Sequence, residues 1–161
     1  MGRERMQRWL WLALVVIIFD QLSKQLAEAF LNLHQPVYLL PFFDLTLMYN
    51  KGAAFSFLSD QGGWQRWFFI GLALAVTSYL VFWVRRLGRG ERWVAVALSL
   101  VIGGAIGNVV DRIFYGQVID FIHLHYQQWY WPAFNIADSA ITVGVVVLIF
   151  DSLFLASKRS N

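Results

Sequence analysis

The chain has 161 residues, of which 58% are hydrophobic and 14% are charged, whereas soluble domains average roughly 45–50% and about 25%, so we expect a membrane protein. This length has room for one domain, and we expect residues 1–161 to form a single membrane-embedded unit. The lack of cysteine excludes disulfides, thiolate metal sites and a cysteine nucleophile, and a net charge of only +3 without a basic run interleaved with polar residues predicts no nucleic-acid partner.

Four apolar segments are each close to the ~20 residues that a helix needs to cross about 30 Å of hydrocarbon. They predict an α-helical integral membrane protein with four transmembrane helices. The first segment is too long for a signal peptide and lacks a small-residue cleavage pattern, so we interpret it as a retained span. The predicted spans are 9–30, 67–84, 93–114 and 136–157.

Basic residues are concentrated on one side of these spans. The connectors 31–66 and 115–135 contain only Lys51 and Arg66, whereas lysine and arginine cluster in the other flanks. Cytoplasmic loops carry the excess of basic residues, so both termini and the middle loop are predicted to be cytoplasmic. The clustered residues are Arg3, Arg5, Arg8, Arg85, Arg86, Arg89, Arg92, Lys158 and Arg159.

The first outer connector is predicted to contain a small β-structured region on the membrane surface. Val37–Leu40 and Phe43–Met48 are typical of short strands, Pro41 separates them, and Asn50-Lys51-Gly52 is typical of a turn. The apolar residues of this connector are equally compatible with plain packing at the membrane interface. Both interpretations stay open at this point.

The first span contains an acid and a base at helical spacing. Asp20 and Lys24 stand at i, i+4 with the acid toward the N-terminus, which is the favourable orientation for an ion pair within the helix. We favour this structural role. The functional alternative is that Asp20 supports reactive acids elsewhere in the chain from the side.

The third span combines small residues with a polar end. Gly103 and Gly107 have the four-residue spacing that lets helices approach closely. Asn108, Asp111 and Arg112 then need partners in protein or water, because lipid would penalise them. Asp111 and Arg112 point about 100° apart on a helix and cannot pair along it, so each is expected to meet another segment. A polar cluster is therefore predicted at the outer end of the bundle.

Two carboxylates, Asp120 and Asp138, lie near the outer membrane boundary on either side of an aromatic connector. An acid at the edge of hydrocarbon is costly and is a functional-site hypothesis by default, and the natural partner is the other acid. Two close carboxylates share a proton, so that one acts as base on a water while the other donates a hydrogen bond to a carbonyl. The simpler alternative is that both acids cap or solvate the ends of segments.

The same residues suggest two other chemistries, a metal site and a transport path. His123 and His125 would point to one side of a strand beside Asp120, but a catalytic zinc needs three protein ligands and the sequence has no HExxH, so we predict no metal and no cofactor. A small transporter remains an alternative, in which the acids, Asn108 and Arg112 form a proton or ion path. Four spans without detectable inverted repeats argue against it.

Five motifs spread over nearly the whole chain carry a family resemblance. They are Asp20-Gln21-x-x-Lys24, Asn50-Lys51-Gly52-Ala53-Ala54-Phe55-Ser56, Gly103-Gly104-Ala105-x-Gly107-Asn108-x-x-Asp111-Arg112, Val118-x-Asp120-Phe121 and Phe134-Asn135-x-Ala137-Asp138. In this order and on a chain of this length, they closely resemble the lipoprotein signal peptidase family, signal peptidase II of bacteria.

The resemblance implies an aspartic endopeptidase of the bacterial inner membrane with its active site toward the outer face. Its substrates would be diacylglyceryl-modified prolipoproteins, cut just before the lipid-modified cysteine, and it would contact membrane lipid, be inhibited by globomycin-like peptides and act as a monomer. By this resemblance Asp120 and Asp138 form the catalytic dyad. The residues implied to bind substrate or support the site are Asn50, Gly52, Asn108, Arg112, Asn135, Asp20 and Asp111.

The charge asymmetry yields a direct test of orientation. In a chain without native cysteine, Gly62→Cys should react in intact spheroplasts with a membrane-impermeant thiol reagent, and Gly88→Cys should react only after lysis. Labelling of Gly62→Cys only from the cytoplasmic side would reverse the predicted topology.

Overall fold

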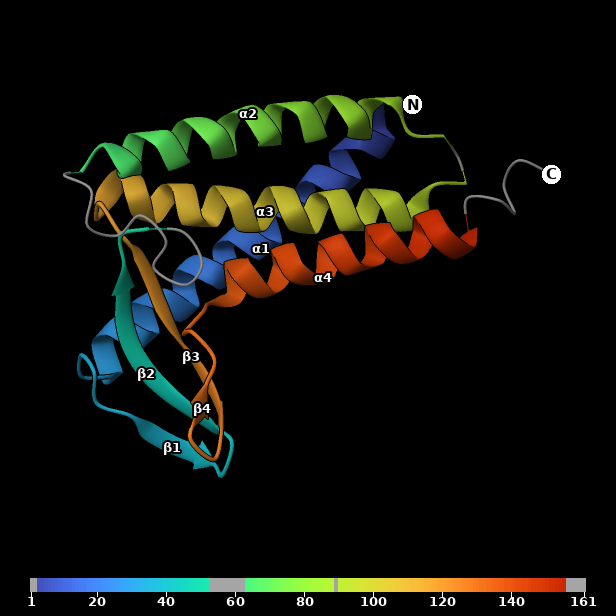
Figure 1. Cartoon of the computed structure of the whole chain (residues 1–161). Coiled ribbons are helices and arrows are strands. Elements are labelled where there is room, and N and C mark those ends of the chain that lie inside the picture. Colours follow the sequence, from blue (N-terminus) through green and yellow to red (C-terminus); the bar gives the residue numbers. More distant parts are fainter. Residues whose placement is uncertain (1–2, 53–62, 89, 156–161) are drawn as a thin grey trace.

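The computed structural model describes residues 3–52, 63–88 and 90–155, and it combines four long helices with a small antiparallel sheet (Figure 1). The sheet projects from one end of the helix bundle, and the start of the first helix and the end of the fourth lie at the opposite end. The helices are α1 (Arg3–Phe30), α2 (Trp64–Arg86), α3 (Arg92–Phe114) and α4 (Ile136–Phe150), which a π-helical turn, η2 (Asp151–Leu155), extends.

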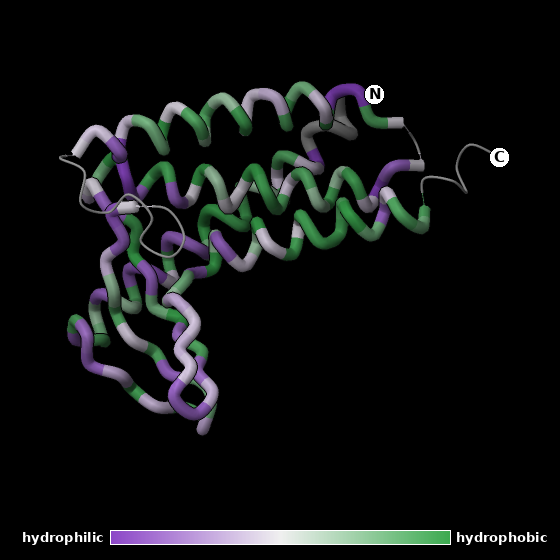
Figure 2. The backbone as a smooth tube through the Cα atoms, in the orientation of Figure 1, coloured by the Kyte–Doolittle hydropathy of each residue, from purple (hydrophilic) through white to green (hydrophobic). Residues whose placement is uncertain are grey.

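The prediction of four transmembrane helices is confirmed. Within the described residues, four helices are long and apolar enough to cross a membrane, and their candidate spans are Arg8–Phe30, Trp64–Arg86, Arg92–Phe114 and Ile136–Leu155. The second helix is longer at both ends than the predicted 67–84, because helical hydrogen bonding continues through polar residues beyond the apolar stretch. Residues 156 and 157 of the predicted fourth span lie outside the described residues. Apolar residues cover the helices along most of their length (Figure 2).

Helix α3 forms the centre of the bundle. In α3, 56% of the apolar stretch is buried, against 22% or less in each of the other spans. Leu98 and Ile102 of α3 pack with Leu80 and Val84 of α2 and with Ala13 of α1. The outer faces of the other helices carry exposed aliphatic and aromatic side chains, as expected for surfaces that face lipid.

Glycines on α3 allow two of its neighbours, α1 and α4, to approach closely. An added Cβ at Gly103 would lie 2.7 Å from the carbonyl oxygen of Ala13 on α1, and one at Gly107 would lie 2.5 Å from Oδ2 of Asp20. A Cβ at Gly104 would overlap the carbonyl oxygen of Ala137 on α4. The predicted close packing at Gly103 and Gly107 is therefore confirmed, and Gly104 extends it to the fourth helix.

The strands of the sheet follow the order β1-β2-β3-β4, and neighbouring strands are antiparallel. The β-structured interpretation of the first outer connector is confirmed, since β1 (Val37–Leu40) has the predicted bounds and β2 (Phe43–Asn50) continues two residues beyond its prediction. The other strands are β3 (Val118–Tyr126) and β4 (Trp129–Tyr130). In the β2–β3 pair, Met48 lies opposite Asp120 and Asn50 opposite Val118, so the end of β2 reaches the first acid.

The packing of α3 against α4 can be tested with one methyl group. Gly104→Ala should lower the free energy of unfolding by about 1–3 kcal/mol, because the Cβ meets backbone atoms of α4 that have no alternative rotamer. The matched control is Gly71→Ala on α2, where a Cβ would meet no described atom within 4 Å. Thermal unfolding in detergent micelles, followed by the fluorescence of the eight tryptophans, compares the two. Equal midpoints would contradict the packing argument.

Candidate active site

Asn135 joins the two acids that the sequence singles out. It is the N-cap of α4, where its Oδ1 accepts a hydrogen bond of 2.9 Å from the backbone N–H of Asp138. Its Nδ2 donates to Oδ1 of Asp120 at 2.7 Å. The side chain is fully buried. A single amide therefore holds the first turn of α4 and strand β3 in a defined relation.

Each acid also receives an amide donor from a different element. Nδ2 of Asn108 on α3 donates to Oδ1 of Asp138 at 2.8 Å. Nδ2 of Asn50, at the end of β2, donates to Oδ2 of Asp120 at 3.2 Å. The oxygen of Asn50 is occupied by the backbone N–H of Gly52 at 2.9 Å, so its NH₂ group is directed to the acid.

The environment of Asp120 favours its protonated form. The side chain is only 3% exposed, and this burial raises the pKa of Asp120 to about 7 from an ordinary value of 3.8. The negative charge of Asp138 also raises this pKa, whereas the hydrogen bonds from Asn50 and Asn135 oppose the shift. Near neutral pH Asp120 is therefore present in both its protonated and its ionised form.

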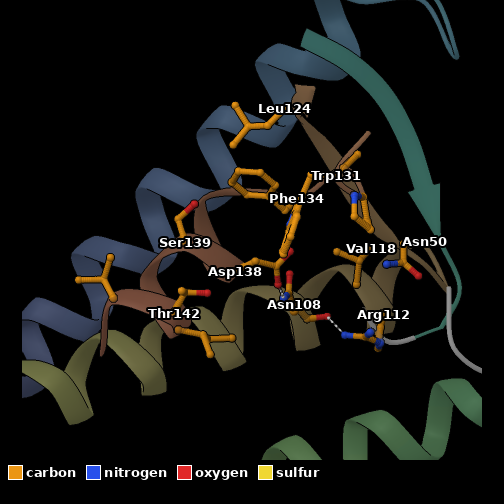
Figure 3. Close-up of a pocket in the computed structure, with 14 residues that line it drawn as sticks. Asn50, Asn108, Arg112, Val118, Leu124, Trp131, Phe134, Asp138, Ser139 and Thr142 are labelled. Carbon is orange, nitrogen blue, oxygen red and sulfur yellow. Dashed lines mark hydrogen bonds between the residues drawn. The ribbon is translucent and has the colours of Figure 1, made fainter. Parts of the chain in front are cut away.

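A cavity of about 620 Å³ adjoins the acids, and Asp138 lines it directly (Figure 3). Asp120 is more deeply buried and contacts Asn50, which lines the cavity. Both polar and apolar side chains line the cavity. Polar groups are contributed by Asn50, Asn108, Arg112, Asp138, Ser139 and Thr142, and apolar ones by Val118, Leu124, Trp131, Pro132, Ala133, Phe134, Ile141 and Val143.

Arg112 fastens the turn that follows β2 to α3. Its Nη2 donates to the carbonyl oxygen of Gly52 at 2.7 Å, and its guanidinium carbon lies 5.2 Å from the centre of the Phe69 ring on α2. Its Nη1 approaches the carbonyl oxygen of Asn108 at 3.4 Å, as Figure 3 shows. The prediction that Arg112 meets another segment is confirmed, and Arg112 and Asn108 line the same cavity.

A buried ion cluster lies behind the acids. Nζ of Lys24 is 2.8 Å from Oδ2 of Asp20 and 2.8 Å from Oδ2 of Asp111, and all three side chains are at most 1% exposed. Asp111 also accepts hydrogen bonds from Nε2 of Gln21 and from the backbone N–H of Ile119. The predicted pair within α1 and the predicted interhelical partner of Asp111 are therefore both present.

The two roles weighed for Asp20 are not exclusive. Its Oδ2 pairs with Lys24, and its Oδ1 accepts the backbone N–H of Ala137 at 2.9 Å, next to Asp138. Sequence reasoning named Lys24 as the ion-pair partner of Asp20 but missed its contact with Asn108, whose Oδ1 accepts a hydrogen bond from Nζ at 3.0 Å. The spacing within α1 indicates the ion pair but not this contact with α3.

The two histidines point to one side of β3, where both contact Asp44. Nδ1 of His123 and Nε2 of His125 lie 3.2 Å and 3.4 Å from Oδ2 of Asp44 on β2. Side chains alternate along a strand, so these odd-numbered residues point to the opposite face of β3 from Asp120. Among the described residues, no group of three or more histidine, aspartate or glutamate side chains is placed to hold a metal ion.

Comparisons with known proteins agree with this architecture. Residues 12–154 match the family described as signal peptidase (SPase) II. The lipoprotein signal peptidase of Pseudomonas fluorescens (strain Pf-5) is 55% identical, over 99% of this chain and 95% of that protein. That of Pseudomonas aeruginosa (strain UCBPP-PA14) is 53% identical, over 95% of this chain and 90% of that protein.

The fold of this chain is also similar to that of a solved structure described as a bacterial membrane enzyme. It matches this chain with a TM-score of 0.82 and 32% sequence identity, over 91% of this chain and 88% of that one. A second such structure gives a TM-score of 0.80 at 29% identity, over 93% of this chain and 94% of that one. With a family match along nearly its whole length and relatives of more than 50% identity, this chain belongs to the signal peptidase II family.

Proposed function

We propose that this protein is an aspartic endopeptidase that removes the signal peptide from diacylglyceryl-modified prolipoproteins, just before the lipid-modified cysteine, with Asp120 and Asp138 as its catalytic pair. Membership of the signal peptidase II family supports the reaction. The observation that carries the residue assignment is the shared Asn135 amide, which holds a buried acid of raised pKa next to an acid that lines a cavity. The transporter alternative finds no support in this family.

The two acids have different roles in the proposed mechanism. Asp120, whose pKa burial raises to about 7, supplies the proton, and Asp138, which lines the cavity in the first turn of α4, acts as the base. Asp138 takes a proton from a water in the cavity as the water oxygen attacks the scissile carbonyl carbon. Asp120 gives its proton to the carbonyl oxygen, and a tetrahedral diol forms.

Collapse of the diol completes the reaction. Asp120, now ionised, takes back a proton from one diol hydroxyl while the C–N bond breaks and Asp138 delivers its proton to the leaving nitrogen. The products are a carboxylic acid and an amine, and each aspartate regains its starting protonation state. Because both steps move protons between the same two groups, no further acid or base is needed.

The surrounding residues position the substrate and the acids. Asn108 and Arg112 contribute amide and guanidinium groups to the lining of the cavity, where a peptide backbone needs polar partners. Gly52 holds the rim of the site, since its N–H is bonded to Asn50 and its carbonyl oxygen to Arg112. Asp20 and Asp111 support the site from behind through Lys24. The apolar residues of the lining fit the hydrophobic segment of a signal peptide.

We place the protein in the bacterial inner membrane, with both termini cytoplasmic and the cavity toward the outer face. The start of α1 and the end of α4 lie at the end of the bundle opposite the sheet, which supports this orientation (Figure 1). The exposed apolar helix faces fit direct contact with membrane lipid. The whole chain would act as one monomeric peptidase domain, and globomycin-like peptides would compete with substrate for the cavity.

The raised pKa of Asp120 predicts an unusual pH dependence of stability. Between about 3.8 and about 7, the folded protein binds more protons at this site than the unfolded chain does, so this site stabilises the fold at acidic pH and loses that contribution as pH rises through about 7. Asp120→Asn removes the titration. The wild-type unfolding midpoint minus that of Asp120→Asn should therefore fall from pH 4 to pH 8.

The measured quantity is how this difference in unfolding midpoint changes with pH, and not its absolute value. The asparagine variant is destabilised at every pH, because its NH₂ group lies close to the amide donors of Asn50 and Asn135. Scanning fluorimetry in one detergent over the whole pH range is sufficient. A difference that stays constant, or that grows as pH rises, would contradict the proton assignment to Asp120.

The catalytic pair is tested with Asp120→Asn and Asp138→Asn. Each substitution should lower the turnover of a purified lipid-modified prolipoprotein by about 10²–10⁴-fold or more, while substrate binding persists. This range is the usual contribution of general acid–base catalysis. The double variant should be little slower than either single one, since the acids act as a unit. Chelators should have no effect.

The matched control is Asp151→Asn, which makes the same chemical change in a buried acid at the end of α4 opposite Asp138. This variant should cleave the substrate at the wild-type rate. Turnover is followed by release of signal peptide in detergent, without gradient or nucleotide. Near-normal turnover of either dyad variant, or solute flux in liposomes together with intact prolipoprotein, would rule out the aspartic mechanism.

A further inference from the structure

We infer that Lys24 is a positioning residue, which orients the amide of Asn108 so that it donates to Asp138 and keeps this acid as the ionised member of the pair. The inference rests on the proposed function and deepens it. Lys24 does not line the cavity, but its positive charge acts on Asp120, whose pKa it lowers. The effect inferred here is a separate one on Asp138, transmitted through Asn108.

The ammonium group of Lys24 is surrounded by oxygen atoms of the protein. An ammonium group has three N–H donors and no acceptor. Here its Nζ contacts three oxygens, namely Oδ2 of Asp20 at 2.8 Å, Oδ2 of Asp111 at 2.8 Å and Oδ1 of Asn108 at 3.0 Å. The side chain is 1% exposed, so solvent does not compete for these donors.

This geometry determines the orientation of the Asn108 amide. An amide has nearly the same shape when its oxygen and nitrogen are exchanged, but only the oxygen can accept from an ammonium group. Nδ2 of Asn135 also lies 3.3 Å from Oδ1 of Asn108, as a second donor. The amide nitrogen of Asn108 must then face Asp138, where it donates to Oδ1 at 2.8 Å.

The orientation has a chemical consequence at the acid. An N–H donor stabilises a carboxylate in its ionised form and disfavours the protonated form. If the Asn108 side-chain amide were flipped, its oxygen would face the Asp138 carboxylate. That contact would be favourable only with a proton on Asp138. Through Asn108, Lys24 therefore biases the shared proton toward Asp120, opposite in sign to the direct effect of its positive charge on the pKa of Asp120. A second contact connects Lys24 to the first turn of α4, which carries Asp138. The ion-pair partner of Lys24, Asp20, accepts a hydrogen bond from the backbone N–H of Ala137.

A merely structural role is the competing explanation. Lys24 lies between Asp20 and Asp111, and it would then do no more than compensate their buried charges. Removing it would lower folded yield and thermal stability but leave the ionisation of the catalytic pair unchanged in the molecules that fold. The pH profile of kcat separates the two roles, because its acidic limb reports the protonation of the base in the enzyme–substrate complex.

The test variant is the double substitution Lys24→Met with Asp111→Asn, which removes one buried cation and one buried anion together. Its matched control is Asp111→Asn alone, which retains Lys24 and its contact with Asn108. We expect the midpoint of the acidic limb of kcat to rise by about one pH unit or more in the double variant, as for the loss of a hydrogen bond to a charged group. The control should keep the wild-type midpoint, and KM should change less than kcat in the double variant.

Asn108→Ala is a second test that leaves the buried ions untouched. It should produce the same upward shift of the acidic limb, and adding the Lys24→Met and Asp111→Asn changes to it should shift the midpoint no further. A wild-type midpoint in Asn108→Ala would overturn the inference even if the Lys24 variants fail to fold. A wild-type midpoint in a folded double variant would overturn it as well.

The outcomes separate this inference from the proposed function. If the wild type releases no signal peptide, or if Asp138→Asn remains active, the proposed function fails and the role of Lys24 fails with it. If the wild type cleaves and Asp138→Asn does not, but the acidic limb stays in place in the Lys24 and Asn108 variants, only the positioning role is wrong.

Discussion

The architecture of this protein depends on one ammonium group shared by two carboxylates in the interior of a membrane bundle. Lys24 of α1 reaches Asp20 of its own helix and Asp111 of α3, and none of these side chains is exposed by more than 1%. Breaking a buried ion pair typically costs about 3–5 kcal/mol, and charges inside a membrane are costly without partners. This contact therefore specifies how α1 and α3 meet. The close approach at Gly107, where a Cβ would lie 2.5 Å from Asp20, brings the helices near enough for it to form.

The site in front of this ion cluster consists of two acids whose surroundings differ. Asp120 lies in a strand and is buried, which raises its pKa to about 7, whereas Asp138 begins a helix and lines the cavity. Asparagine amides connect these surroundings. Asn135 contacts both segments, and Asn108 links Asp138 to the buried ammonium group. Amides suit this task because each can accept from a donor on one side and donate to a carboxylate on the other.

The placement of the cavity suits hydrolysis near a membrane surface. A peptide in hydrocarbon has its backbone groups satisfied within its helix, and exposing a scissile bond requires polar partners nearby. Here the lining of the cavity combines Asn108 and Arg112 with apolar residues such as Phe134 and Ile141. The sheet lies at the same end of the bundle, and its strand β2 ends at Asn50, so the region outside the spans contributes directly to the site.

Much of this protein followed from local sequence patterns. The four spans and the bounds of β1 are properties of apolar length and strand periodicity, which neighbouring residues determine together. Asp120 and Asp138 were singled out because an acid near hydrocarbon needs an explanation. The tertiary structure decided the contacts between distant residues. Lys24 meets Asn108 across 84 positions, and His123 meets Asp44 across 79. Such pairs depend on which helix faces pack and in which register strands pair, and a long-range contact leaves no pattern within either segment alone.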